Sequence, residues 1–291
     1  MRTLEAKRQM FATKQSPKIS SKWGKWVPKC ANSTCANRTL LRSFAHRNRG
    51  MNVDGNWYCG PECFDQAVKG KIAELMTFQG RPAKVRSSRV PIGLLLLQRG
   101  ILSNEQLRVA LEQHKATELN FGDVVQKLGF ATQEQVTAVV AAQWGCPVFS
   151  LGDRQIEVKV RVPRLLLELY GMLPVHYGEL ERRLLIGFVN GVQHQILYTI
   201  GHMTACTVAP CFITAREYQM HLHSPSTPFL RDDEQVFEQI VEPAEMARIT
   251  RSYVVQLAAE QMLMGKCRDF LWTRIWGRNR EMDLLFRLQT S

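Results

Sequence analysis

The chain has 291 residues, of which 45% are hydrophobic, and a formal net charge of +12. A chain of this length can bury real cores and is expected to hold two or three modules. Its apolar run around residue 95 is far shorter than the ~18 residues of a membrane-spanning helix, and residues 1–8 lack the apolar stretch of a signal peptide. We therefore expect a cytoplasmic protein with no transmembrane segment, whose eight cysteines are thiols or metal ligands rather than disulfides.

The positive charge is concentrated at the beginning of the chain. Residues 1–90 contain 18 Lys and Arg against 5 Asp and Glu, whereas the remaining residues hold 20 against 21. Residues 1–29 mix basic and polar side chains, which predicts a disordered basic tail. Such a tail attracts polyanions weakly, including nucleic acid and anionic lipid. The alternative is a solvated tail that only aids solubility.

Two pairs of cysteines follow the tail, within residues 30–72. Their positions are Cys30, Cys35, Cys59 and Cys63. Zinc prefers four soft ligands in a tetrahedron, often supplied as two close pairs separated by a longer loop. His46 could replace one thiolate, although the spacing does not require it. The segment has too few apolar residues to fold alone, so a metal would supply the missing stability.

The sequence around the second pair supports a metal-binding module. Residues 55–59 read as a strand that enters a knuckle, and residues 64–68 as a helix that leaves it. A cysteine pair between a strand and a helix resembles the second half of a treble-clef zinc finger. The alternative is four unrelated thiols, because the first pair is wider than the commonest two-residue gap.

Residues 91–143 then contain one pattern twice, offset by 29 positions. Each copy has two glycines seven residues apart, which are Gly93 and Gly100 in the first copy and Gly122 and Gly129 in the second. Each then has a hydroxyl residue with Gln three positions later, Ser103 with Gln106 and Thr132 with Gln135. That spacing predicts a capping box at a helix start. Each copy therefore predicts a short helix, a glycine stop, a cap and a second helix.

This repeat resembles the N-terminal domain of the assembly ATPases of type II secretion and type IV pilus systems, the GspE N-terminal or MshEN domain. Ile92-Gly93 and Phe121-Gly122 match the family's Leu-Gly element, and Gln143 matches the glutamine that ends the second unit. The resemblance covers residues 85–222, roughly half of the chain. It implies two units in tandem, which in some family members bind cyclic di-GMP.

The resemblance also implies where that ligand would lie. The matching positions are Gly93, Gly100, His114, Gly122, Gly129 and Gln143. However, the arginine that opens each family unit is Pro91 in the first copy and Asn120 in the second, and His114 replaces the first unit's glutamine. Arginine can meet a guanine edge or a phosphate through two hydrogen bonds, so we expect weakened binding. The alternative is a ligand-free scaffold whose glycines stop helices with left-handed dihedrals.

Beyond the repeat, helix and strand patterns alternate up to about residue 222. Pro163 and Gly171 bracket a predicted helix, and Thr214 with Glu217 predicts another capping box. The expected fold is α+β: a tandem helical-hairpin repeat packed with a small α/β subdomain and preceded by the zinc module. Cys146, Cys206, Cys211 and Cys267 are expected to be small core residues. The histidines His176, His194 and His202 are scattered, so we assign no catalytic residue.

The last part of the chain is predicted to be a separate module. Residues 223–240 read as a linker, and residues 241–291 as a long helix from about Pro243 to Met264 followed by a β-hairpin. A helix and paired strands also follow the N-terminal domain in the secretion ATPases. The chain lacks a Gly-x-x-x-x-Gly-Lys-Ser/Thr phosphate loop, so it cannot cradle ATP in the manner of that motor.

These patterns predict a non-enzymatic regulatory or adaptor protein that acts by protein–protein contact. The resemblance implies a secretion or pilus assembly component as the partner and cyclic di-GMP as a ligand, whereas the cysteine spacing predicts zinc. The alternative is a zinc-dependent nucleic-acid-binding regulator that uses the basic N-terminal region. The few, unevenly spaced aromatic residues of that region weigh against this alternative.

Overall fold

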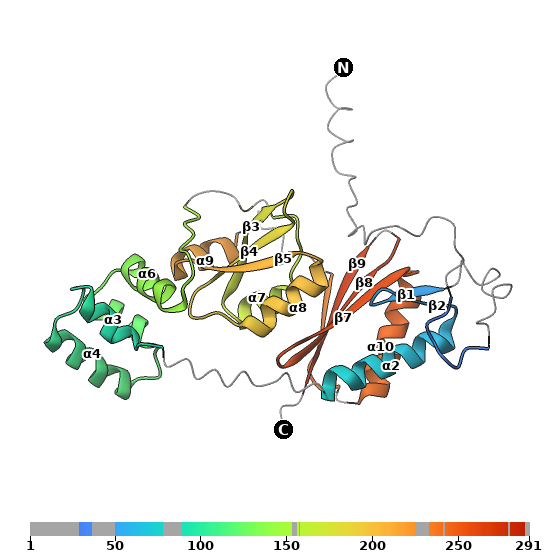
Figure 1. The fold of residues 1–291 in the computed structure, drawn as a ribbon. Coiled ribbons are helices and arrows are strands. Elements are labelled where there is room, and N and C mark those ends of the chain that lie inside the picture. Colours follow the sequence, from blue (N-terminus) through green and yellow to red (C-terminus); the bar gives the residue numbers. More distant parts are fainter. Residues whose placement is uncertain are drawn as a thin grey trace, which may run out of the picture.

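The computed structural model describes residues 29–36, 50–77, 89–152, 156, 158–224, 233–240, 242–278 and 280–288. Residues 1–28 of the expected basic tail, and His46, lie outside the described residues. The described elements form a helical repeat, a small α/β subdomain and a larger sheet with two long helices (Figure 1). Within the described residues, no helix combines the length and the apolar character needed to cross a membrane.

The helical repeat comprises four helices, as the two sequence copies predict. They are α3 (Ile92–Gln98), α4 (Asn104–Ala116), α5 (Phe121–Lys127) and α6 (Gln133–Trp144). Ser103 and Thr132 both form the predicted capping boxes. Each hydroxyl accepts from the backbone amide of the glutamine three positions on, and each backbone amide of Ser103 and Thr132 donates to that glutamine's side-chain oxygen. Gly100 and Gly129 both have φ of +68°, so the prediction of left-handed helix stops is confirmed at these two positions.

The same prediction is wrong for the first glycine of each copy. Gly93 and Gly122 lie inside α3 and α5, where they allow a close approach between helices. A Cβ at Gly93 would lie 2.7 Å from Leu107 Cδ1, and one at Gly122 would lie 2.9 Å from Val136 Cγ1. These glycines are therefore required by packing rather than by backbone conformation.

The α/β subdomain has a three-stranded sheet with the order β3-β4-β5. Its elements are α7 (Arg164–Leu169), β3 (Met172–Gly178), β4 (Arg183–Phe188), α8 (His194–Thr204), β5 (Thr207–Phe212) and α9 (Ala215–Leu222). The β3 and β4 strands are antiparallel, whereas β4 and β5 are parallel. Val136 and Val140 of α6 enter the core of this subdomain, so the repeat and the subdomain are packed together as expected.

The remaining strands form a six-stranded sheet with the order β2-β1-β7-β8-β9-β6. They are β1 (Met51–Val53), β2 (Asn56–Tyr58), β6 (Glu234–Phe237), β7 (Gln261–Cys267), β8 (Phe270–Trp276) and β9 (Glu281–Arg287). Helices α2 (Pro61–Thr77) and α10 (Pro243–Gln256) pack against each other beside this sheet (Figure 1). The predicted hairpin is confirmed as β8 and β9, which pair in antiparallel register.

This sheet corrects three expectations about the two ends of the chain. Residues 30–72 are not a separate module, because β1 pairs in parallel with β7 and extends the C-terminal sheet. Residues 223–240 are not only a linker, because β6 pairs with β9. The helix expected to reach Met264 ends at Gln256, and β7 follows it. Apolar residues continue from α10 into β7, so the periodicity of the sequence does not show where the helix ends and the strand begins.

Strands β7, β8 and β9 of the six-stranded sheet are buried on both faces. Met262, Leu271 and Leu284 face the core that α2 and α10 share. Phe270, Trp272 and Leu285 instead join the core of the α/β subdomain. Alternate residues of each strand point to opposite faces, so the two-sided burial explains why these strands are almost continuously apolar.

Candidate functional site

The four expected metal ligands are brought together in space, as the spacing predicted. The Sγ atoms of Cys30, Cys35, Cys59 and Cys63, called the cysteine cluster below, all lie within 4.8 Å of one another. Cys35 and Cys59 are 3.4 Å apart at sulfur, and Cys59 and Cys63 are 3.9 Å apart. Four sulfurs at 2.3 Å from a central zinc would be ~3.8 Å from each other. The arrangement therefore fits one tetrahedral zinc ion.

Local structure positions the ligands of the cysteine cluster. Cys59 directly follows β2, and Cys63 lies in the first turn of α2. The backbone amide of Ala31 donates to the carbonyl of Trp57 at 2.8 Å. This bond joins the segment of the first cysteine pair to the antiparallel hairpin of β1 and β2. The structure thus places the second pair, Cys59 and Cys63, between a strand and a helix, as expected.

The surroundings of the cysteine cluster affect the charge of its thiols in two ways. Burial raises the pKa of the Cys59 and Cys63 thiols, which opposes the thiolate form unless a bound cation compensates the charge. Asn32 donates from Nδ2 to Cys63 Sγ at 3.3 Å, a contact that stabilises a thiolate ligand. A zinc ion bound here would supply structural stability as a fully protein-ligated centre.

The polar positions that the resemblance assigns to cyclic di-GMP are engaged within the fold. Gln143 donates from Nε2 to the carbonyl of Val90 at 2.7 Å. The Nδ1 atom of His114 lies 2.8 Å from the carbonyl oxygen of Leu119, and its ring packs edge-on against Phe121.

The positions of the family arginines are N-caps in this chain. Pro91 is the N-cap of α3 and Asn120 is the N-cap of α5, and neither makes a side-chain capping bond. Gly100 and Gly129 leave open space where a Cβ would be, so their turns are accessible. The turns are thus present, whereas the arginines that open the family's units are replaced by Pro91 and Asn120.

One arginine lies close to this region that the sequence pattern did not single out. The Arg89 guanidinium carbon is 3.1 Å from the centroid of the Trp144 ring, a cation–π arrangement. Arg89 precedes Pro91 by two residues, and Trp144 directly follows Gln143. Arg89 does not occupy the family's arginine position, which is Pro91, so the sequence pattern did not single it out. Only the fold brings Arg89 onto Trp144 at the end of α6.

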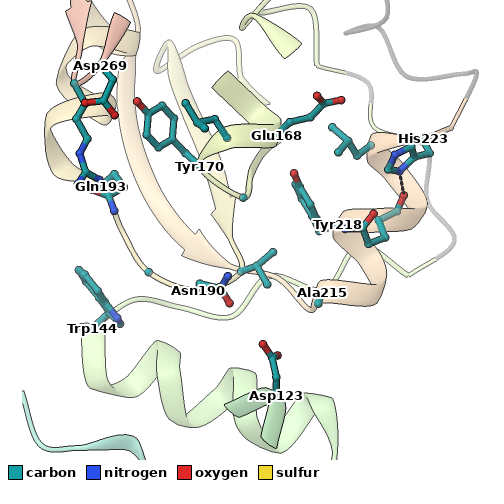
Figure 2. Close-up of a pocket in the computed structure, with 17 residues that line it drawn as sticks. Asp123, Trp144, Glu168, Tyr170, Asn190, Gln193, Ala215, Tyr218, His223 and Asp269 are labelled. Atoms are coloured by element: carbon teal, nitrogen blue, oxygen red, sulfur yellow. Dashed lines mark hydrogen bonds between the residues drawn. The ribbon is translucent and has the colours of Figure 1, made fainter. Parts of the chain in front are cut away.

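A cleft of about 980 Å³ lies where the helical repeat, the α/β subdomain and the β7–β8 turn meet (Figure 2). Three of its aromatic side chains are Trp144, Tyr170 and Tyr218, and Asp123 of α5 enters from the side of the repeat. The Tyr170 hydroxyl donates to the Cys267 carbonyl at 3.3 Å, which holds the β7–β8 turn on α7. No sequence pattern indicated this cleft, because its walls come from three segments that are distant in the chain.

The remaining cysteines and histidines have separate environments. Cys211 and Cys267 are core residues as expected, and burial raises the pKa of each to about 12. Cys146 and Cys206 are half-buried at the edge of the same core. The three histidines contact different partners: His176 stacks on Phe149, His194 lies near Trp144, and His202 lies 3.8 Å from Asp54.

No protein-family model matches this sequence, and no curated protein matches it. A structure of MshE with cdg is similar at 20% identity and a TM-score of 0.40, over 46% of this chain and 97% of that chain. The N-terminal domain of XpsE is similar in one crystal form at 16% identity and a TM-score of 0.36, over 47% and 92% of the two chains. In another crystal form the XpsE domain is similar at 19% identity and a TM-score of 0.27, over 47% of this chain and 94% of that chain. The resemblance read from the sequence is thus accompanied by structural similarity over about half of this chain.

Proposed function

We propose that this chain is a non-enzymatic adaptor or regulator, related to the N-terminal domains of secretion and pilus assembly ATPases, that acts by protein–protein contact. The observation that carries the proposal is the hydrogen bonding of Gln143 to Val90 and of His114 to Leu119. A ligand at the glycine turns would have to displace these bonds, and a displaced hydrogen bond lowers the net gain on binding. The repeat therefore favours a scaffold role over tight binding of cyclic di-GMP.

The cleft supports a protein partner. Trp and Tyr side chains are the residues that most often dominate protein interfaces, and Trp144, Tyr170 and Tyr218 line this cleft. The cleft is lined by the repeat, the α/β subdomain and the β7–β8 turn, so a partner bound there would contact all three. We propose a secretion or pilus assembly component as that partner. Copurification of the wild type, but not of a Trp144→Ala variant, with such a component is the expected result.

The ligand side of the proposal is tested by calorimetry with cyclic di-GMP. Each missing bidentate arginine contact is worth roughly 1.5–3 kcal/mol. Two losses weaken the affinity by about two to four orders of magnitude, at about 1.4 kcal/mol per tenfold. We expect no binding by the wild type at low micromolar ligand, and measurable binding after Pro91→Arg and Asn120→Arg are combined. Tight binding by the wild type would contradict the scaffold role.

A second candidate is a zinc-dependent nucleic-acid-binding regulator, favoured by the concentration of positive charge in residues 1–90. Its electrostatic contacts would weaken steeply with salt. We expect only weak, sequence-independent DNA binding, lost when residues 1–29 are deleted. Sequence-selective binding that disappears on zinc chelation would instead favour this second function.

A further inference from the structure

The cysteine cluster lies beside the β1–β2 hairpin, which forms one edge of the six-stranded sheet. The β1–β2 hairpin runs directly into Cys59, and α2 begins at Pro61 with Cys63 in its first turn. The hairpin lies along β7, and α2 lies along α10 (Figure 1). A metal bound by the cluster would therefore fix the hairpin and the helix relative to each other.

The hairpin is attached to the sheet by one short strand, β1, whose Met51 and Val53 side chains are buried in the core beside β7. Strand β1 has three residues. The amides of Asn52 and of Asp54, which directly follows the strand, donate to the carbonyls of Glu260 and Met262, each at 3.0 Å. The Met264 amide of β7 also donates to Asp54 Oδ1 at 2.9 Å. So short a strand needs a second support to remain paired.

Helix α2 provides a larger contact on the neighbouring elements. Phe64, Val68 and Ile72 are buried with Met246 of α10 and Met262 of β7. Burial of such side chains stabilises the attached state by about 1.5–3 kcal/mol each. The hydrophobic contact of α2 can support the hairpin only while both are held at a fixed angle, which is what the cysteine cluster provides.

We propose that the metal centre is a clasp that controls access to the β7 edge of the six-stranded sheet. When the metal is bound, the hairpin and α2 cover β7 and α10 as one unit. When it is removed, β1 separates from β7 while β7, β8 and β9 stay paired. The opened edge of β7 then presents unpaired backbone groups, the feature to which an extended peptide adds as a strand.

The test is amide hydrogen exchange on the full chain, measured residue by residue by NMR before and after zinc is removed with a chelator. The Met264 amide is the reporter, because it belongs to β7 but donates to Asp54 of the hairpin. We expect its exchange to rise about tenfold or more on chelation, whereas the Leu284 amide in β9 is unchanged. The zinc content is measured in the same samples and is expected to be about one per chain.

Two variants separate the clasp from general loss of structure. Asp54→Gly removes the acceptor of the Met264 amide but tolerates the positive φ of +48° at this position, so it should raise Met264 exchange with zinc still bound. Cys146→Ser removes a half-buried thiol outside the cluster and should leave Met264 exchange and zinc content unchanged. Unchanged Met264 exchange after chelation overturns the proposal, as does an equal rise at Leu284 or the absence of bound zinc.

Discussion

Asp283 of β9 is a fully buried carboxylate. Its partners come from β8 and from the α/β subdomain. It accepts from Trp272 Nε1 at 2.8 Å and from Arg274 Nε at 2.8 Å. Arg161, which precedes α7, lies 3.2 Å from its second oxygen. Arg274 Nη2 also donates to that second oxygen at 2.9 Å. Because donors from β8 and from Arg161 both bind this carboxylate, it joins the six-stranded sheet to the α/β subdomain.

Removing that charge should be costly. Asp283→Asn would leave Arg274, only 4% exposed, without its counter-ion, and breaking a buried pair in this way costs about 3–5 kcal/mol. Urea unfolding of the variant should therefore show a large loss in the free energy of unfolding. Glu105→Gln, which breaks an exposed pair with Arg108, is the matched control and should change it by less than about 1 kcal/mol. Equal effects of the two substitutions would contradict the assigned role of Asp283.

At the scale of single elements, Glu217 connects the start of α9 to the loop after β-bridge residue Val148. One oxygen accepts from the amides of Leu151 and Gly152 at 2.8 and 3.2 Å. The other accepts from the Thr214 amide and hydroxyl in the capping box. Burial opposes ionisation, but these hydrogen bonds outweigh it and lower the pKa of Glu217.

The lowered pKa makes this connection dependent on pH. A carboxyl with a lower pKa in the folded state than in the unfolded state contributes stability that is fully present above the unfolded pKa. That contribution is lost as the pH falls through the folded pKa. We expect Glu217→Gln to destabilise the protein at pH 7 and to have a smaller effect at pH 3, measured by thermal unfolding. An effect of equal size at both values would mean that the ionised form has no special role.

Elements set by local sequence were predictable, and elements set by distant pairing were not. The capping boxes at Ser103, Thr132 and Thr214 depend on residues three positions apart, so the sequence alone located the helix starts. The cysteine cluster was found because zinc restricts ligand type and spacing. The pairing of β1 with β7 joins residues about 210 positions apart, as the bond from Met264 to Asp54 shows. Arg89 was missed for a related reason, since only the fold brings it onto Trp144.

At the scale of the whole molecule, the six-stranded sheet lies between the helix pair α2 and α10 and the α/β subdomain, and it shares a core with each. Phe270, Trp272 and Leu285 pack into the α/β subdomain, and Thr199 of α8 donates to the Lys266 carbonyl at 2.6 Å. A chain divided at a linker of residues 223–240 would instead unfold in two independent steps. The shared core removes that independence, because neither part can expose its face without opening the other.

The shared core predicts one cooperative thermal transition for the full chain in scanning calorimetry. A fragment of residues 85–222 should behave differently, since it leaves uncovered the apolar surface that Trp272 and its neighbours bury, and should bind a hydrophobic dye more strongly than the full chain. The Trp272→Ala variant of the full chain is the internal test of coupling. Loss of this fully buried ring should cost about 3–5 kcal/mol and lower the single transition. Two separate transitions in the wild type, or a fragment as stable and as poor in dye binding as the full chain, would show that the two parts fold independently.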